Sequence, residues 1–479
     1  MARETTLRRT KIVATIGPAS LRLETIAAMV RAGMDVARLN TSHGEIADHV
    51  AACELIRRVA DEERKPIAVL MDLGGPKLRT GPTRNGGLID IETGSEILLT
   101  YNHEASTERR ISVEYARLTQ DVLAGDRVLV DDGKIELEVS HVTPDGLECR
   151  VVHGGMLGPS QGVGFPSSNL TQPALTERDR EAIEAGVAAG VDFFGLSFVR
   201  HVEDVVMTRD LVHSHGAETP IIAKIERRQA VENLDEILAE ADGAMVARGD
   251  LGVELPPEDV PIQQRRIIAS AAKHMIPVIT ATQMLESMVD SPRPTRAESS
   301  DVANAVWEMS DALMLSEETA VGKYPVEAVA MMDRIIRRAE EAMPAEADNF
   351  PTPETDDHSY IVALAARRIV ERDPNMQGVV CFTRSGYTAF LMSKVHPNAP
   401  IFGVTPSESV CRRLSLARSV IPMHGPVVGS SEEMLDLVDR LLQEGRHVAE
   451  GEEVVVVARM PVQSPGTTNF LKLHRIGES

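Results

Sequence analysis

Short runs of apolar and β-branched residues alternate along the chain with longer segments in which apolar positions recur every three or four residues. Runs of the first kind are typical of buried strands, and the second pattern is typical of amphipathic helices. The runs in the first two thirds of the chain cover 11–17, 35–40, 67–72, 193–198, 221–226, 243–250, 277–282 and 311–316. Because strand–helix alternation produces a parallel sheet, eight such units predict an α/β fold of the (β/α)₈ TIM-barrel class rather than a doubly wound sheet.

Residues 81–165 interrupt this alternation between the third and fourth barrel strands. They contain short strands of alternating polarity, separated by the turn signals NGG, TPDG and HGG. This pattern predicts an inserted all-β lid domain. We expect it at the rim of the barrel, where barrels of this class carry their active sites.

The composition changes again after residue 340. Residues 340–358 are acidic and rich in proline, which is typical of a linker or a surface excursion. Strand-like runs then return at 378–383, 400–405, 453–459 and 469–475. We therefore predict a barrel catalytic domain made of residues 1–80 and 166–343, a lid domain of residues 81–165, and a C-terminal α/β regulatory domain of residues 355–479.

Composition and charge narrow the possible partners. The chain has 479 residues, 43% of them hydrophobic, and 50 basic against 72 acidic residues give a net charge of −22. This balance argues against nucleic acid or an anionic membrane as the main partner. The four cysteines form no C-x-x-C pair, no apolar run reaches membrane-spanning length, and the start MARETTLRRTKIV lacks the apolar region of a signal peptide. We expect a cytoplasmic protein that holds any anionic substrate with a local basic cluster or with metal ions.

Polar residues follow five of the predicted strands at their carboxyl ends, where barrels of this class collect catalytic groups. A single polar strand end is commonly only a helix cap, but five together indicate an active site. These strand ends contain Arg38, Asn40, Ser42 and His43, then Asp72, then Lys224 and Glu226, then Gly249 and Asp250, and finally Thr282.

Glu226 and Asp250 follow adjacent strands and are expected at the same mouth of the barrel. Two carboxylates with room for water suit Mg²⁺, which completes its shell with water and substrate. The alternative is that Glu226 only forms a structural ion pair with Lys224, Arg227 or Arg228.

Lys224 precedes Glu226 by two residues, so both side chains emerge on the same face of the strand. A lysine buried in a barrel is costly unless it meets negative charge. Lys224 could therefore neutralise a phosphoryl group or a developing enolate. Gly249 would let a ligand approach the backbone closely, and the turn ARGDLG would offer N–H groups to a carboxylate.

Several longer motifs occur in a fixed order: KIVATIGPAS, RLNTSHG, AKIERRQAVENLDEIL, MVARGDLGVELP, ATQMLESM, PRPTRAESSDVANAV and, near the end, GTTNFLKLH. In these motifs and in the order of its domains, the chain resembles the pyruvate kinase family over nearly its whole length. The resemblance implies transfer of the phosphoryl group of phosphoenolpyruvate to ADP, giving pyruvate and ATP in the last step of glycolysis. It also implies a homotetramer.

The resemblance also implies roles for individual residues. Glu226 and Asp250 would hold Mg²⁺, with Mn²⁺ as a possible substitute, and Lys224 would stabilise charge on the transferring group and on the enolate. Arg38 would grip the phosphate, and the backbone of Gly249 and Asp250 with Thr282 would bind the carboxylate. Thr282 would also lie on the proton path to the enolate. The nucleotide would be contacted by His43, Arg79 and Asn40.

One departure from the family pattern concerns potassium. Members that need this ion place it beside the residues that correspond here to Asn40, Ser42, Asp72 and Leu73. The neighbouring motif, usually D-T-K-G-P-E, reads DLGGPK here, so that Lys77 replaces a glutamate. Potassium-independent members share this lysine, and the resemblance therefore implies that K⁺ is not required. The alternative is that Lys77 simply extends into solvent.

Two further departures concern the nucleotide. Glu317 stands where the family usually has a glycine, and the lid sequence GPSQG (158–162) lacks the lysines that many members direct at the nucleotide. An altered nucleotide preference is one possible consequence. Neither departure touches the predicted metal and lysine centre.

A candidate effector site lies in the C-terminal domain. Thr383, Arg384, Ser385, Gly386 and Thr388 follow a predicted strand and should open a helix, where hydroxyls and free N–H groups suit a phosphate. The resemblance implies an allosteric site for a phosphorylated effector, a sugar phosphate or a nucleotide. An ordinary capped turn is the alternative.

Two other functions remain open from the sequence. A Mg²⁺-dependent barrel aldolase or lyase could share the carboxylate pair and the lysine, although it would not need the lid, His43 or Arg79. A catalytically weak paralogue could act as a metabolite sensor through its C-terminal domain. Only Glu317 and the missing lid lysines favour the sensor, and the complete set of candidate catalytic residues argues against it.

Overall fold

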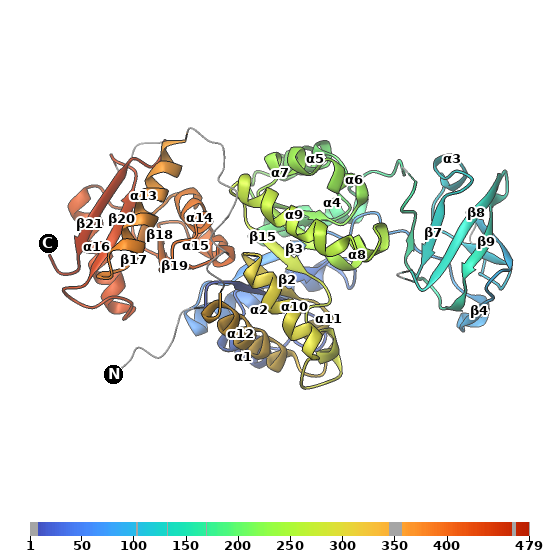
Figure 1. Cartoon of the computed structure of the whole chain (residues 1–479), viewed down its shortest axis with the longest axis horizontal. Helices are drawn as coiled ribbons and strands as arrows, with labels where there is room; N and C mark the ends of the chain where they lie inside the picture. The colour runs from blue at the N-terminus through green and yellow to red at the C-terminus, as the bar shows by residue number, and fades with distance from the viewer. Residues whose placement is uncertain are drawn as a thin grey trace.

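The computed structural model describes residues 8–101, 104–131, 133–168, 170–343, 357–461 and 466–478. A central barrel lies between an inserted β region on one side and a C-terminal α/β region on the other (Figure 1). The barrel is closed and parallel, in the strand order β1-β16-β15-β14-β13-β12-β3-β2. Its strands are β1 (Lys11–Thr15), β2 (Val36–Asn40), β3 (Ala68–Asp72), β12 (Phe193–Leu196), β13 (Ile221–Ile225), β14 (Gly243–Ala247), β15 (Val278–Ala281) and β16 (Ala312–Leu315). The predicted TIM-barrel class is confirmed.

The barrel strands are short apolar runs because both of their faces are buried. One face packs under the surrounding helices, and the other fills the barrel interior with a cluster that includes Val36, Leu70, Ile222, Met245 and Ile279. The surrounding helices are α1 (Leu23–Ala32), α2 (Ile46–Glu63), α4 (Glu177–Ala188), α5 (Val202–Ser214), α6 (Arg228–Glu232), α7 (Leu234–Glu240), α8 (Arg248–Glu254), α9 (Val260–Lys273), α10 (Arg296–Trp307), α11 (Glu317–Ala320) and α12 (Pro325–Glu341). None of the helices in the described ranges is long and apolar enough to cross a bilayer.

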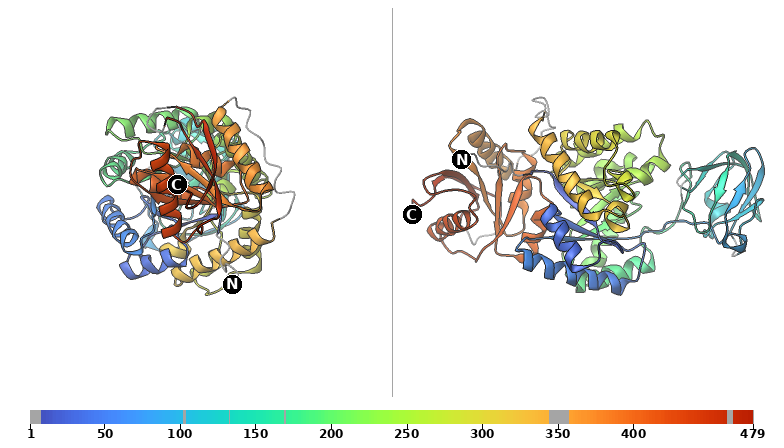
Figure 2. Two further views of the ribbon diagram at one scale, coloured as in Figure 1. Left: turned by 90° about the vertical axis from the view of Figure 1, so that its left-hand side faces the viewer. Right: turned by 90° about the horizontal axis from the view of Figure 1, so that it is seen from below.

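The inserted region leaves the barrel after β3 and returns before α4, and two connections join it to the barrel (Figure 2). It has its own apolar core, which includes Leu99, Val128, Leu137 and Val151. Six strands form one sheet in the order β11-β7-β8-β9-β5-β6, and β10 pairs with β4. The elements are β4 (Ile89–Ile91), β5 (Glu96–Thr100), β6 (Arg110–Ser112), α3 (Leu118–Asp121), β7 (Arg127–Val130), β8 (Ile135–Thr143), β9 (Gly146–His153), β10 (Gly155–Leu157) and β11 (Val163–Gly164).

The C-terminal region is a five-stranded sheet in the order β19-β18-β17-β20-β21, in which only β21 is antiparallel to its neighbour. Apolar side chains lie on both faces of this sheet in two clusters. The elements are α13 (His358–Arg372), β17 (Met376–Phe382), α14 (Tyr387–Lys394), β18 (Ile401–Thr405), α15 (Glu408–Arg413), β19 (Val420–His424), α16 (Ser431–Glu444), β20 (Glu453–Ala458) and β21 (Phe470–Arg475).

The C-terminal region docks on the amino ends of the barrel strands. Lys394 of α14 forms a fully buried ion pair with Asp311, which directly precedes β16. Lys11, the first residue of β1, donates to the carbonyl of Val420 at 2.7 Å. Leu416 joins the apolar cluster inside the barrel. The carboxyl ends of the strands therefore remain directed toward the inserted region, on the side of the barrel where α8 lies (Figure 1).

Three details differ from the sequence-based prediction or fall outside it. The run 243–250 is a strand only as far as Ala247, and Arg248 to Glu254 form helix α8 instead of an open turn. Strand β19 was not predicted; it contains Pro422 and lies at the edge of its sheet, where a proline is tolerated. Of the predicted linker 340–358, residues 344–356 lie outside the described residues.

Candidate active site

The uppermost layer of the barrel interior is charged, whereas the layers below it are apolar. Side chains alternate between the two faces of a strand, so Ile222 and Lys224 of β13 both point into the barrel. The same period of two brings Arg38 of β2 and Asp72 of β3 into this layer. All three charged side chains are buried. Three of the five strand ends that the sequence singled out therefore meet in one layer.

The guanidinium of Arg38 is held from two sides. Its Nε donates to Oδ2 of Asp72 at 2.8 Å, and its Nη1 donates to the hydroxyl of Thr15 at 3.0 Å. Burial works against ionisation of Asp72, but the positive charges of Lys224 and Arg38 outweigh burial and hold the pKa of Asp72 below its ordinary value. Asp72 therefore remains a carboxylate that orients both cations.

The ammonium of Lys224 lies at the centre of the charged layer. Its Nζ donates to the hydroxyl of Ser197 at 2.6 Å, and it lies 3.3 Å from Asp72 Oδ1 and 3.5 Å from Glu226 Oε2. Burial alone would lower the pKa of Lys224, but the two carboxylates outweigh burial and raise it. Lys224 is therefore a buried cation whose charge is fixed by its neighbours.

The two carboxylate oxygens of Glu226 differ in their hydrogen bonding. Its Oε1 accepts a hydrogen bond from the backbone N–H of Phe198 at 2.6 Å, whereas its buried Oε2 has no hydrogen-bond partner among the described residues. Burial raises the pKa of Glu226, although the charge of Lys224 opposes this shift. A buried carboxylate oxygen without a donor is suited to a metal ion.

The second expected metal ligand, Asp250, lies in the first turn of α8, and its negative charge acts on both Glu226 and Lys224. Within the described ranges, no group of three or more His, Cys, Asp or Glu side chains could hold a metal ion by itself. A pair of carboxylates would leave the other positions of a Mg²⁺ ion to water and substrate oxygens, which is the coordination this ion commonly adopts. The side chains present therefore fit such an ion.

Thr282 lies just beyond β15 in a strained backbone conformation. Its φ is 69° and that of Gln283 is 56°, a region that non-glycine residues rarely occupy. The Thr282 hydroxyl accepts a hydrogen bond from Gly249 N–H at 2.8 Å. Arg248 supports the strained segment by donating to the carbonyls of Thr282 at 2.6 Å and Ala281 at 3.2 Å. This guanidinium also pairs with Asp301.

Positive charge gathers at the mouth of the barrel. The residues expected to contact nucleotide include His43 and Arg79, and Arg79 donates to the backbone carbonyl of Ser160 in the lid at 3.0 Å. Partial burial lowers the pKa of His43, and so do the nearby charges of Arg79, Lys77 and Arg38. Glu317 acts in the opposite direction, but burial and the three cations outweigh it and favour the neutral imidazole, in a setting that suits a polyphosphate.

The residues expected at a potassium site lie at the ends of β2 and β3, where Asn40 pairs in register with Asp72. Asn40 accepts from the N–H of Ser42 at 3.2 Å, and Leu73 is buried. Lys77 is directed toward Asp250, with its Nζ 3.7 Å from Asp250 Oδ1, and both side chains are more than one third exposed. The lysine ammonium thus neighbours a candidate metal ligand.

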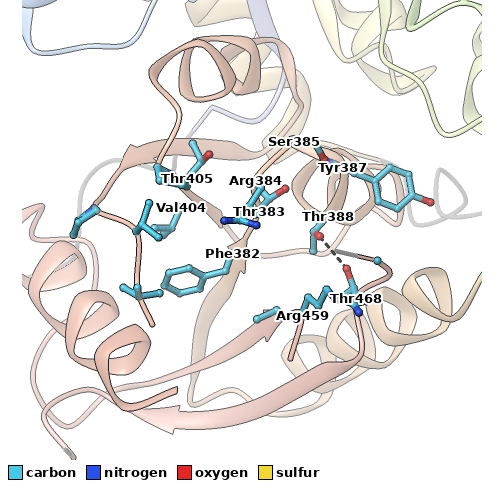
Figure 3. A pocket seen from close by; sticks show the side chains of 16 residues that line it. Phe382, Thr383, Arg384, Ser385, Tyr387, Thr388, Val404, Thr405, Arg459 and Thr468 are labelled. Atoms are coloured by element: carbon cyan, nitrogen blue, oxygen red, sulfur yellow. Dashed lines mark hydrogen bonds between the residues drawn. The ribbon is translucent and has the colours of Figure 1, made fainter. Parts of the chain in front are cut away.

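The candidate effector residues surround a cavity of about 400 Å³ in the C-terminal region (Figure 3). Thr383, Arg384, Ser385 and Thr388 line it, and Gly386 caps α14 with a φ of 92°. Thr383 accepts from the N–H of Gly386 at 2.9 Å, and Ser385 accepts from that of Tyr387 at 3.4 Å. These two bonds also fit the alternative of a capped turn, whereas the cavity favours a ligand site.

Several residues at these sites were not singled out from the sequence. Ser197 binds Lys224, and Phe198 binds Glu226, although both belong to an apolar run with no polar signal beyond one serine. Arg248 was expected at the end of a predicted strand, within the common triplet RGD, but no role was assigned to it. Arg459 and Thr468 line the cavity of Figure 3 from a part of the chain that is far from 383–388. These contacts depend on tertiary structure, which local sequence patterns do not encode.

The fold and the buried charged layer define a (β/α)₈-barrel protein with an inserted β region and a charged site at the carboxyl ends of its strands. A family model of the pyruvate kinase barrel domain matches residues 7–329, and one of the pyruvate kinase alpha/beta domain matches residues 361–474. The chain belongs to the pyruvate kinase family. This result does not favour the aldolase, lyase or sensor alternatives.

Individual pyruvate kinases are similar to this chain over nearly its whole length. A pyruvate kinase of Mycobacterium tuberculosis is 43% identical over 471 residues, covering 98% of this chain and 99% of the relative. One of Geobacillus stearothermophilus is 43% identical over 477 residues, covering 98% and 81%. The crystal structure of a pyruvate kinase from Cryptosporidium parvum superposes with a TM-score of 0.90 at 33% identity, covering 98% of this chain and 96% of that one.

Replacing Arg248 should disturb the strained backbone at Thr282, which its guanidinium supports. In Arg248→Lys, a single ammonium cannot reproduce the two hydrogen bonds that the guanidinium donates to the Thr282 and Ala281 carbonyls, so Thr282 should shift. We expect turnover to fall by roughly 10²-fold, the cost of a displacement near 1 Å at a reacting centre. Steady-state rates measure this effect. Arg265→Lys, whose side chain is 75% exposed, is the matched control, and equal rates in both variants would refute the role of Arg248.

Proposed function

We propose that the charged layer of the barrel transfers the phosphoryl group of phosphoenolpyruvate to ADP. The observation that carries this proposal is the buried cluster of Arg38, Asp72, Lys224 and Glu226. Its two cations are already balanced by its two carboxylates, so a highly anionic substrate needs further positive charge. A divalent cation would supply that charge, and positioning together with electrostatic stabilisation is what phosphoryl transfer requires.

Asp250 and Glu226, whose Oε2 has no hydrogen-bond partner, would hold Mg²⁺ or Mn²⁺. When bound, the ion would neutralise phosphate and enolate oxygens. Arg38, fixed by Asp72 and Thr15, would orient the phosphate, and Lys224 would stabilise negative charge as it moves from phosphate to enolate.

The substrate carboxylate would be held beside Thr282 and the backbone of Gly249 and Asp250, at the start of α8. The Thr282 hydroxyl donates to the Ala281 carbonyl at 2.6 Å and accepts from Gly249, so its position is well defined. That position suits a group that passes a proton to the enolate carbon. His43, Arg79 and Asn40 would contact the nucleotide, whose phosphates match the positive surroundings of His43.

Lys224→Met tests this function directly. We expect kcat to fall by on the order of 10³-fold or more, the scale of a cation that stabilises a transferring phosphoryl group. The fold should survive because Asp72 keeps its pair with Arg38 and Glu226 can take up a proton. A coupled pyruvate assay gives the rate, and circular dichroism checks the fold.

Lys323→Met serves as the control for this measurement, since Lys323 pairs with Asp290 at the surface, away from the charged layer. Its rate should match that of the unmodified protein. Near-normal turnover in Lys224→Met would contradict the assignment.

We also propose that potassium is not required. Lys77 puts a fixed positive charge next to Asp250 and near His43, at the mouth where a monovalent ion would otherwise add charge. Turnover in potassium and in tetramethylammonium salts of equal ionic strength should therefore be nearly equal. A large potassium requirement would exclude this role of Lys77.

The cavity around Arg384 is proposed as the site of a phosphorylated allosteric effector. Its support is the combination of two guanidinium groups, Arg384 and Arg459, with the hydroxyls of Thr388 and Thr468, which lie 2.9 Å apart (Figure 3). Calorimetric titration with sugar monophosphates, sugar bisphosphates and nucleoside monophosphates should show binding by the unmodified protein and loss of binding in Arg384→Met. Absence of binding by every compound would favour the capped-turn alternative.

Three broader proposals follow from the same family membership. We propose the division into a barrel domain (1–80 and 166–343), a lid domain (81–165) and a C-terminal regulatory domain (355–479). We also propose a homotetramer, and light scattering would test this assembly. Its support is the exposed apolar side chain of Leu473 on the edge strand β21. A cytoplasmic location is supported by four buried, unpaired cysteines, and detection of the native protein in an oxidising compartment would refute it.

A further inference from the structure

Phe198 occupies a strained position next to the candidate metal site. It follows β12 with a φ of 56°, in the left-handed region that bulky side chains avoid. The backbone N–H of this residue donates to Glu226 Oε1 at 2.6 Å. This bond fixes one oxygen of the Glu226 carboxylate, so that Oε2, which has no hydrogen-bond partner among the described residues and lies 3.5 Å from Lys224 Nζ, is the oxygen left for a metal ion. Such a conformation persists only where its surroundings hold it in place.

Two neighbours enclose the ring of Phe198. The guanidinium carbon of Arg227 lies 4.8 Å from the ring centroid, which is the geometry of a cation–π contact. On another side, Gly75 of the lid hinge approaches so closely that a Cβ there would lie 2.5 Å from the ring. The ring is therefore confined between the guanidinium of Arg227 and the backbone of Gly75.

Arg227 is itself anchored at a second point. Its Nη1 donates to Oε1 of Glu254, and both side chains are largely buried. Glu254 is the last residue of α8, one helical turn beyond Asp250. Arg227 is therefore connected to Glu226 through Phe198 and to Asp250 through Glu254 and α8. One small cavity between the barrel mouth and the lid is lined by Phe198 together with Glu226, Arg227, Asp250 and Glu254.

We propose that Arg227 is a positioning residue that fixes the two metal-binding carboxylates, Glu226 and Asp250, relative to each other. This inference depends on the proposed role of those carboxylates as ligands of a divalent cation. A planar guanidinium can stack on Phe198 and donate to Glu254 at the same time, whereas a lysine ammonium can satisfy only one of these contacts well.

The test uses Mn²⁺ as the probe and the full-length chain. Electron paramagnetic resonance of free Mn²⁺ gives the dissociation constant of the substrate-free protein, and steady-state assays give the Mg²⁺ concentration for half-maximal rate. In Arg227→Met we expect both values to rise by roughly 10–100-fold, the usual effect of removing a residue that orients metal ligands. The rate at saturating Mg²⁺ should change less than the metal affinity does.

Two further variants keep the result interpretable if Arg227→Met does not fold. Arg227→Lys retains the charge and should still weaken Mn²⁺ binding. Glu254→Leu should weaken it by removing the oxygen that accepts from Arg227. Arg265→Gln, at a side chain that is 75% exposed and faces Glu308, is the control and should bind Mn²⁺ as the unmodified protein does. Mn²⁺ affinity equal to the control in the folded Arg227 variants would overturn the inference.

The same measurements separate this inference from the proposed function. If the unmodified protein turns over phosphoenolpyruvate and ADP but the Arg227 variants keep normal Mn²⁺ affinity, only the positioning role fails. If the unmodified protein neither binds Mn²⁺ nor forms pyruvate, the proposed function fails first.

Discussion

Two cations and two carboxylates share the uppermost interior layer of the barrel, and their mutual pairing constrains the rest of the site. Lys224 can stay charged when buried only because Asp72 and Glu226 lie within 3.5 Å of its Nζ. Asp72 in turn stays ionised because Arg38 and Lys224 outweigh the cost of burial. Each charge depends on the next, so removing a partner costs more here than losing a surface ion pair, except where the remaining group can take up a proton, as Glu226 can when Lys224 is replaced.

This layer lies between two regions with different roles. The C-terminal region closes the amino ends of the strands with buried polar contacts and with Leu416 inside the barrel, which favours a firm attachment. The inserted region faces the carboxyl ends, where Arg79 reaches Ser160 across the hinge. Although the chain carries a net charge of −22, cations surround His43 at this mouth. The local field can therefore attract anionic substrates that the overall charge would repel.

Period-two alternation was enough to place Lys224 and Glu226 on one strand face. Asp72 reaches Lys224 across the barrel interior, because β12 lies between β3 and β13. The end of β14 was misjudged because apolar residues lead directly into Arg248, and the helix start is marked only by Asp250 in its first turn. Strand β19 was missed because Pro422 lowers the strand signal. The contacts of Ser197, Phe198 and Arg227 join segments separated in sequence, so no local pattern could reveal them. The potassium and effector assignments rest on family likeness and stay predictions.

The most direct measurement is the stoichiometry of the unmodified protein's reaction with phosphoenolpyruvate, ADP and Mg²⁺. The proposed role of the charged layer is to move a phosphoryl group to a nucleotide, so pyruvate and ATP should form in equal amounts and neither should form without ADP. Pyruvate released without ADP would indicate a lyase or hydrolytic reaction. Phosphoenolpyruvate binding without any turnover would indicate a sensor. Either result would contradict phosphoryl transfer to ADP as the reaction of this site.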